Sequence, residues 1–226
     1  MPKILASIKD LSEAKILINT DIDIIDLKDP LKGALGRLSE QDIIDIIKFI
    51  DKKKLTSSTV GDLPNNEALI SKNVNEISAT AVDFIKIGVY DNFYINTLCK
   101  IKSSTKLIAV FFADVFLPTE SEIRSLKVSG FSGVMVDTSN KKLGNLFAHT
   151  SSSEISNFLE IAKKLDLLTG VAGSINETHI AEIVKLNPNY MGFRGALCKD
   201  KLVRNSEISQ HSVNNIINLV NDLKQN

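Results

Sequence analysis

The sequence predicts an α/β protein folded as a single (β/α)8 TIM barrel, and three observations support this. Short apolar runs alternate with amphipathic stretches along the whole chain, which is typical of parallel βα units. The alternation occurs eight times in 226 residues, a length that suits such a barrel. The first apolar run lacks the GxGxxG motif that follows the first strand of a dinucleotide-binding doubly wound sheet. We expect one domain over residues 1–226.

Eight strands are expected where runs rich in Ile, Val, Leu and Phe are flanked by turn-forming residues. In chain order they span residues 3–8, 22–28, 55–61, 83–89, 106–113, 132–138, 167–173 and 190–196. Because an amphipathic stretch separates each strand from the next, all eight strands are expected to run parallel.

Eight helices are expected in the amphipathic stretches. They span residues 11–19, 39–51, 66–80, 92–102, 119–129, 152–165, 176–186 and 212–224. Ser39 and Asn176 stand at two of these starts and are suitable N-cap residues, since their side chains can accept a hydrogen bond from a free backbone N–H group.

The composition favours a soluble, cytoplasmic protein that binds small molecules. Lys plus Arg and Asp plus Glu number 27 each, so there is no global basic field for nucleic acid or an acidic membrane. No apolar run is long enough for a membrane span, and the N-terminal one is too short for a signal sequence. Cys99 and Cys198 lie far apart, which favours free thiols. His149 and His179 lack neighbours at metal-ligand spacing, so no metal and no cofactor are expected.

Two lysines occur within apolar runs that are expected to be buried strands: Lys28 in residues 22–28 and Lys86 in residues 82–90. Burial of an ammonium group costs several kcal/mol unless it is paired, and it is commonly relieved by a lowered pKa. A lysine with a lowered pKa is a better nucleophile at neutral pH. The two lysines therefore point to carbonyl chemistry.

The charged residues near the strand ends are expected to converge. Residues two apart in a strand share a face, so Asp26 and Lys28 point the same way, as Phe84 does with Lys86. Asp137 lies near the end of the sixth strand. In barrel enzymes the functional groups gather at the carboxyl ends of the strands, so these side chains should meet at one mouth.

The simplest alternative is a buried ion pair between Asp26 and Lys28 that only stabilises the barrel. The second lysine favours a chemical role, because two nearby ammonium groups lower each other's pKa. We expect Lys28 to form an imine and Lys86 to accept a proton. Asp26 and Asp137 would then orient these groups or transfer protons.

Three glycine-containing loops follow the second, seventh and eighth strands and are candidates for phosphate binding. Exposed backbone amides in such loops favour anions, and barrel enzymes commonly hold phosphate after the last two strands. The alternative is that the glycines only allow tight turns. The expected binding residues are Gly33, Gly36, Gly173, Ser174, Arg194 and Gly195.

The segment after the sixth strand, residues 138–147, is longer and more polar than usual for a βα loop. We expect it to close over the site. Lys141 or Lys142 could reach a second phosphate from this loop, although solvated lysines are the default there.

Several segments together resemble the (5-formylfuran-3-yl)methyl phosphate synthase family, which makes the furan precursor of methanofuran-type C1 carriers. The resemblance spans nearly the whole chain, and several motifs in the same order are more specific than any one of them. The motifs are residues 23–36 (DIIDLKDPLKGALG), 58–62 (STVGD), 84–90 (FIKIGVY), 136–138 (VDT), 172–175 (AGSI) and 194–196 (RGA).

The resemblance implies a barrel enzyme, a lyase, that condenses two molecules of glyceraldehyde 3-phosphate with loss of one phosphate and two waters. Its Schiff-base lysine falls on Lys28 and its proton-accepting lysine on Lys86, with Asp26 and Asp137 in support. A further functional lysine falls on Lys141 by its spacing from Asp137, with Lys142 as the alternative. We also expect a homo-oligomer.

Other functions remain open. An orotidine-phosphate-type decarboxylase would show Asp-x-Lys-x-x-Asp, which Asp26 and Lys28 match, but Leu31 replaces the last acid. A class I aldolase also fits two barrel lysines, and it would act on trioses without releasing phosphate. A non-catalytic barrel that senses sugar phosphates would form no covalent adduct.

Overall fold

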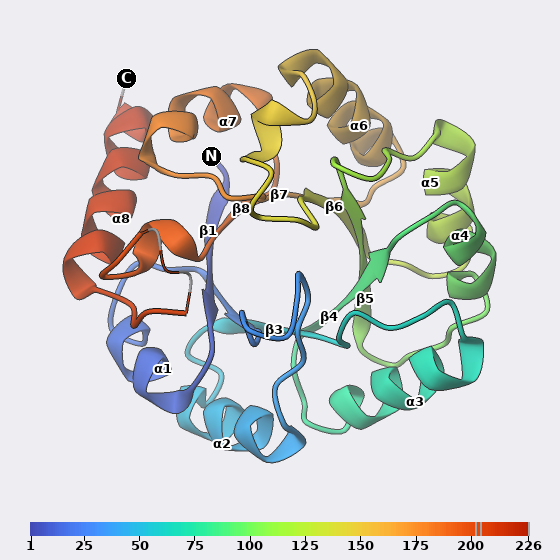
Figure 1. Ribbon diagram of the computed structural model, residues 1–226, viewed down its shortest axis with the longest axis horizontal. Helices are drawn as coiled ribbons and strands as arrows, with labels where there is room; N and C mark the ends of the chain where they lie inside the picture. Colours follow the sequence, from blue (N-terminus) through green and yellow to red (C-terminus); the bar gives the residue numbers. More distant parts are fainter. Residues whose placement is uncertain (202, 204, 226) are drawn as a thin grey trace.

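A closed ring of eight parallel strands forms the centre of the molecule in the computed structural model (Figure 1), which describes residues 1–201, 203 and 205–225. Each strand pairs with the next in sequence, and β1 pairs with β8 to close the barrel. The strands are β1 (Lys3–Ile8), β2 (Ile24–Leu27), β3 (Leu55–Thr59), β4 (Phe84–Val89), β5 (Lys106–Phe112), β6 (Gly133–Asp137), β7 (Leu168–Val171) and β8 (Tyr190–Phe193). The predicted TIM barrel is confirmed.

The helices surround this ring (Figure 1). They are α1 (Leu11–Leu17), α2 (Glu40–Ile50), α3 (Glu67–Ser78), α4 (Phe93–Leu98), α5 (Glu120–Val128), α6 (Ser152–Lys164), α7 (Ile180–Leu186) and α8 (Gln210–Gln225). Three short 3-10 helices are η1 (Leu146–Ala148), η2 (Glu177–His179) and η3 (Gly195–Leu197). Residues 202, 204 and 226 of the predicted domain lie outside the described residues.

The main errors in the predicted bounds lie at element ends. The predicted strand 190–196 ends at Phe193, because residues 195–197 turn into η3 instead. The predicted helix 176–186 is divided into η2 and α7, and Asn176 caps η2 by accepting from the Thr178 N–H. Ser39 caps α2 as predicted, accepting from the Asp42 N–H at 3.1 Å. These ends depend on local hydrogen bonds more than on the apolar pattern.

Alternation along the strands divides the apolar residues into two clusters. The larger fills the space between the barrel and its helices, and the smaller lies inside the barrel, with Leu5, Ile24 and Ile108 among its members. Gly170 is an inner position of β7, where an added Cβ would lie 2.4 Å from the Tyr190 ring. The Tyr190 ring therefore fills the space that a side chain at Gly170 would occupy inside the barrel.

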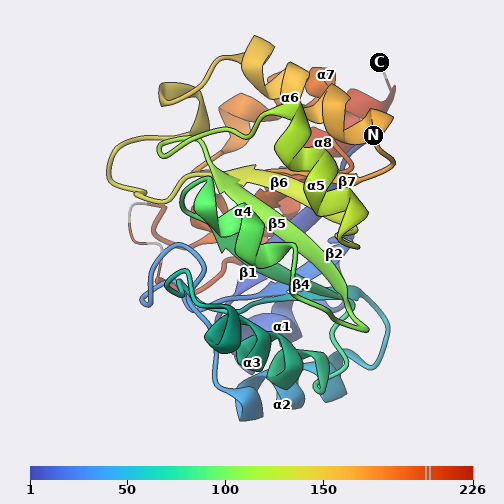
Figure 2. The same ribbon diagram turned by 90° about the vertical axis from the view of Figure 1, so that its right-hand side faces the viewer.

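The segments that follow β2 and β6 lie on the same side of the barrel, in blue and yellow in Figure 2. This is the carboxyl end of the strands, where the catalytic groups of such barrels gather. Among the described residues, no helix is long and apolar enough to cross a membrane.

Candidate active site

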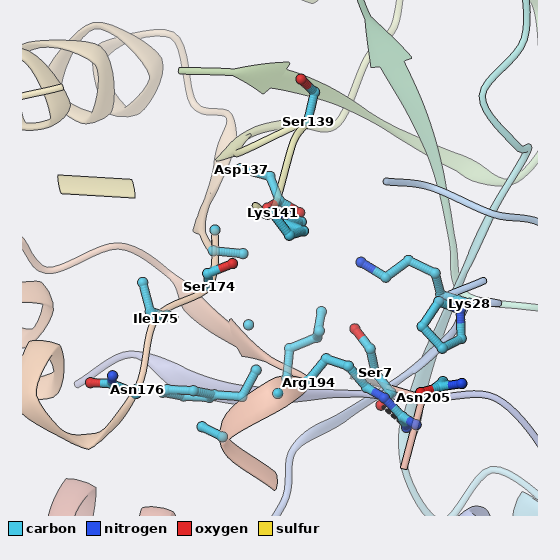
Figure 3. A pocket seen from close by; sticks show the side chains of 18 of the residues that line it. Ser7, Lys28, Asp137, Ser139, Lys141, Ser174, Ile175, Asn176, Arg194 and Asn205 are labelled. Atoms are coloured by element: carbon cyan, nitrogen blue, oxygen red, sulfur yellow. Dashed lines mark hydrogen bonds and ion pairs between the residues drawn. The ribbon is translucent and has the colours of Figure 1, made fainter. Parts of the chain in front are cut away.

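A cavity of about 970 Å³ opens at the carboxyl end of the barrel. Segments from six strands contribute to its wall, so the convergence predicted from strand parity is present. Its polar lining includes Ser7, Lys28, Lys86, Asp137, Lys141 and Ser174. Figure 3 shows Lys28 extending toward the centre of this space, with Asp137 and Lys141 near each other at another part of the wall.

Strand register places Asp26 between two serines and close to a lysine. Asp26 is paired with Ser7 on β1 and with Ser57 on β3, and Thr59 of β3 pairs with Lys86 of β4. The Asp26 carboxylate accepts from the Ser7 hydroxyl at 2.8 Å and from the Ser57 hydroxyl at 2.6 Å. The Lys86 ammonium lies 2.5 Å from the same carboxylate. Both members of this ion pair are almost fully buried.

Asp26 stays ionised in this position. Burial acts to raise the pKa of its carboxyl, but the charges of Lys86 and Lys28 outweigh burial and, with the Ser57 hydrogen bond, hold the pKa below its usual range. The structural alternative, an ion pair between Asp26 and Lys28, is not what the structure shows: Asp26 pairs with Lys86, and the charge of Lys28 acts on Asp26 without a direct ion pair.

Lys28 has the environment that the sequence predicted for a nucleophile. It follows β2 directly, and its residue is 5% exposed. Burial lowers the pKa of its amine from 10.5 to about 8. The carboxylates Asp137 and Asp26 oppose this change, while the ammonium groups of Lys86 and Lys141 add to it. About one tenth of Lys28 is therefore uncharged at pH 7, far more than for a lysine of ordinary pKa.

A second buried ion pair lies at the end of β6. The Lys141 ammonium bonds to the Asp137 carboxylate and to the Thr138 hydroxyl, the latter at 3.0 Å. Burial acts to raise the pKa of Asp137, but Lys141 and Lys28 outweigh it and lower the pKa to about 2. The neighbouring Lys142 is exposed. Of the two loop lysines, Lys141 is thus the one that is held beside Asp137.

The loop after β6 is held by Asp114, which lies just after the end of β5. The Asp114 carboxylate accepts from the Ser139 N–H at 2.6 Å and from the Asn140 N–H at 2.7 Å. It also accepts from the Ser139 hydroxyl. Residues 139–142 line the cavity, so the predicted closing loop does border the site.

The glycines after β2 pack the loop against its neighbours. An added Cβ at Gly33 would lie 1.9 Å from the Asp62 carboxylate, which accepts from the Ala34 and Leu35 N–H groups. The Gly36 carbonyl accepts from the Asp29 N–H at 2.8 Å. Gly33 lines the cavity. An added Cβ at Gly36 would lie 2.2 Å from the Asp29 carbonyl oxygen, so close packing favours glycine at both positions independently of any ligand. Phosphate binding by Gly33 and Gly36 stays a prediction.

After β7 the chain turns sharply at Gly173 and Ser174, which have φ angles of 110° and 50°. A left-handed backbone is unusual for serine and often marks a functional segment. Both residues line the cavity, as does Gly195 after β8. Their predicted role in phosphate binding stays a prediction.

Arg194 lies in the cavity wall, but its charge has a partner that the sequence did not reveal. Its guanidinium binds the Glu13 carboxylate through two nitrogens, at 2.5 and 3.0 Å. It also donates to the carbonyls of Ser7 and Ser206, and Figure 3 shows the side chain running toward Ser7. These contacts favour a structural role, and phosphate binding by Arg194 stays a prediction that they do not support.

Sequence reasoning missed Ser7, Ser57 and Glu13. Ser7 and Ser57 lie on the inner faces of their strands, beside Asp26. The alternation of residues along each strand could have revealed this, but a search for charged residues overlooks serine. Glu13 lies in the first turn of α1, where an acidic residue is common and carries no sign of a distant partner. Among the described residues, there is no group of three or more His, Cys, Asp or Glu side chains that could hold a metal ion.

Known proteins that resemble this chain share most of its length. The 4-HFC-P synthase family model matches residues 4–217. A (5-formylfuran-3-yl)methyl phosphate synthase of Methanococcus aeolicus is 30% identical over 210 residues, covering 86% of this chain and 89% of that protein. The protein of the same name from Methanocaldococcus jannaschii is 29% identical over 225 residues, covering 93% and 96%.

Solved structures share the fold at lower identity. The 3-hexulose-6-phosphate synthase of Salmonella typhimurium superimposes with a TM-score of 0.70 at 15% identity, covering 97% of this chain and 99% of that one. This likeness concerns the barrel alone, whereas the family match rests on sequence over nearly the whole chain. The chain therefore belongs to the 4-HFC-P synthase family.

Proposed function

We propose that this protein is a (5-formylfuran-3-yl)methyl phosphate synthase acting in methanofuran-type biosynthesis. It joins two molecules of glyceraldehyde 3-phosphate and releases one phosphate and two waters, so that six carbons and one phosphate remain in the product. The observation that carries the proposal is the Lys28 amine, whose pKa is lowered to about 8 inside a cavity that also holds the Asp26–Lys86 pair. Family membership supports the same reaction.

Lys28 is the proposed nucleophile. Its uncharged amine attacks the aldehyde carbon of a triose phosphate to give a carbinolamine, which loses water to become an iminium ion. The nitrogen then carries the positive charge, which makes the hydrogen on the adjacent carbon acidic. The negative charges of Asp137 and Asp26 favour a positive charge on the Lys28 nitrogen, so they stabilise the iminium ion.

Lys86 is the proposed acid and then the proposed base. Its ammonium form, paired with Asp26, gives a proton to the departing hydroxyl of the carbinolamine, so that water leaves and Lys86 becomes neutral. Neutral Lys86 then removes the proton from the carbon next to the iminium, which yields an enamine. The positive charge moves from Lys86 to the iminium nitrogen and back, so the total charge in the site is unchanged.

The enamine allows phosphate elimination and aldol coupling to the second triose, after which ring closure and dehydration give the furan. The Asp137–Lys141 pair lines the same cavity as Lys28 and is proposed to serve the second triose phosphate. The segments around Gly173 and Gly195 remain candidates for a phosphate group, because both line the same cavity.

The test is a product assay with glyceraldehyde 3-phosphate as the sole substrate. We expect a furan aldehyde and inorganic phosphate to form in equal amounts. Aldol products without phosphate release would instead support the class I aldolase alternative. Absence of turnover and of any covalent adduct would support a binding barrel and contradict the proposal.

Two adjacent lysines provide a matched control for the same assay. Lys141→Ala removes the partner of Asp137, and we expect it to lower turnover roughly a hundredfold, the lower end for a group in proton transfer or charge stabilisation. Lys142→Ala removes an exposed ammonium and should leave turnover within about twofold. Equal losses in both variants would contradict the assignment of Lys141.

A further inference from the structure

The Asp26 carboxylate lies between two serine hydroxyls that face different cavities. Ser7 lines the cavity at the carboxyl end of the barrel, together with Lys28. Ser57 lines a second cavity, of about 490 Å³, at the amino end. Lys86 lines both cavities, so the Asp26–Lys86 pair lies where they approach each other inside the barrel.

We infer that Ser57 is a positioning residue that fixes the Asp26 carboxylate and thereby sets how tightly Asp26 holds the proton of Lys86. The inference deepens the proposed function and rests on it, because it concerns the group proposed as acid and base. Ser57 acts from the side opposite the cavity that holds Lys28, so its effect passes through Asp26 and not through contact with substrate.

The geometry gives Ser57 this influence. Its hydroxyl and the Lys86 ammonium bind the same carboxylate oxygen, Asp26 Oδ1, at 2.6 and 2.5 Å. Two donors on one oxygen share its negative charge, so each weakens the other. Removing the Ser57 hydroxyl leaves more of that charge to Lys86, whose proton is then held more strongly.

The surrounding charges do not offset this effect. Lys28, directly after β2, and Lys86 on β4 are the cations whose charges act on Asp26. Tyr190 on β8 is buried and feels the Asp26 charge, and both burial and that charge raise the pKa of its hydroxyl, which stays neutral. Asp137 and Lys141 act on Lys28, and neither is among the main charges that act on Asp26. Ser57 is thus a neutral donor in direct contact with Asp26.

The chain offers a matched control one residue away. Ser58 occupies the opposite face of β3, is fully buried, and its hydroxyl has no hydrogen-bond partner among the described residues. Ser57→Ala and Ser58→Ala therefore remove the same atom from the same strand at equal burial. Ser57→Thr keeps the hydroxyl, and its extra methyl group can be accommodated because Ser57 borders the second cavity.

The experiment measures turnover against pH for these three variants, together with the titration of Asp26 by carboxyl NMR. In Ser57→Ala we expect the rising limb of the pH profile, which the Lys28 amine sets, to stay in place. The falling limb, where the proposed acid is lost, should move up by about one unit, since a hydrogen bond to a charged group has about that strength. Turnover should fall up to about tenfold at neutral pH, because the proton is donated less readily, and the loss should shrink on the alkaline side, while the Asp26 titration moves to higher pH. Ser58→Ala should leave both curves in place, and Ser57→Thr should restore them.

Two results would overturn the inference: an unchanged Asp26 titration in Ser57→Ala, or an equal change in Ser58→Ala. A loss of turnover that is uniform across pH would also overturn it, since that is the effect of a structural defect alone. If the unsubstituted protein makes no furan, the proposed function fails. The Asp26 titration then still decides whether Ser57 controls this carboxylate.

Discussion

Two buried ion pairs lie beside the same cavity and have very different surroundings. In the Asp26–Lys86 pair the side chains are 0% and 3% exposed, and in the Glu13–Arg194 pair they are 1% and 5% exposed. Burial therefore does not distinguish them. What differs is the set of partners around each pair.

The Glu13–Arg194 pair is surrounded by backbone groups that use its remaining bonding capacity. Arg194 donates to two carbonyls, and Glu13 also accepts from the N–H groups of Lys9 and Ile208. This network joins β1, α1 and the segment after β8. Beside the Asp26–Lys86 pair, in contrast, lies a third charged group, the Lys28 amine, whose pKa is lowered to about 8. We therefore take the Asp26–Lys86 pair, whose neighbour of like charge is only partly charged, as the candidate for chemistry and the Glu13–Arg194 pair as structural.

The largest expected effect is the loss of turnover when Lys86 is replaced, and a variant without this effect would contradict the contrast between the two ion pairs. Lys86→Ala removes the proposed acid and base, and we expect turnover to fall by roughly 10²- to 10⁴-fold. Slow formation of the Lys28 adduct should persist, because the nucleophile remains. Product assays and borohydride trapping measure the two effects, and full turnover in Lys86→Ala would refute its role.

The structural pair should affect folding more than chemistry. Glu13→Gln keeps the size of the side chain but leaves the Arg194 charge unpaired, so the free energy of unfolding should fall by about 3–5 kcal/mol. Chemical denaturation measures this, with Glu120→Gln in the exposed Glu120–Arg124 pair as a control expected to change it by less than about 1 kcal/mol. A stable Glu13→Gln protein that no longer forms the Lys28 adduct would reverse the two assignments.

Lys28 should reduce stability at neutral pH. Its folded-state pKa is about 8, below the ordinary 10.5, so below pH 8 the folded chain must hold a buried ammonium. Lys28→Met should therefore raise the free energy of unfolding near pH 7 by up to about 3 kcal/mol while abolishing turnover.

The destabilisation caused by Lys28 should depend on pH within a defined range. Between about pH 8 and 10.5 the unfolded chain binds a proton at Lys28 that the folded chain does not, so the unsubstituted protein gains stability relative to Lys28→Met as the pH rises. Denaturation at several pH values tests this. A difference that stays constant through the window would show that the Lys28 pKa is not lowered.

The smallest expected effect is on the rate of adduct formation. About one tenth of Lys28 is uncharged at pH 7 if its pKa is about 8, so trapping should speed up about tenfold by pH 9 and then level off. Trapping followed over this range measures it. A rate that still climbs steeply above pH 10 would indicate an ordinary lysine.

The sequence predicted the barrel and most of the charged site for a physical reason. Both depend on periodicity, and the parity of β2 and β4 places Asp26, Lys28 and Lys86 on the inner face wherever those strands lie in the ring. Which charges pair was not predictable, because strand register brings Lys86 to Asp26 from a distant part of the chain. Arg194 was misjudged for the same reason, since its partner Glu13 lies 181 residues away.

The central claim is that Lys28 forms a covalent imine with a triose phosphate, and one measurement tests it most directly. The protein is incubated with glyceraldehyde 3-phosphate, reduced with borohydride, digested and mapped by peptide mass spectrometry. The account predicts a triose-derived adduct on Lys28, absent from Lys28→Met and still formed in Lys142→Ala. An unmodified Lys28 together with no release of phosphate would contradict it.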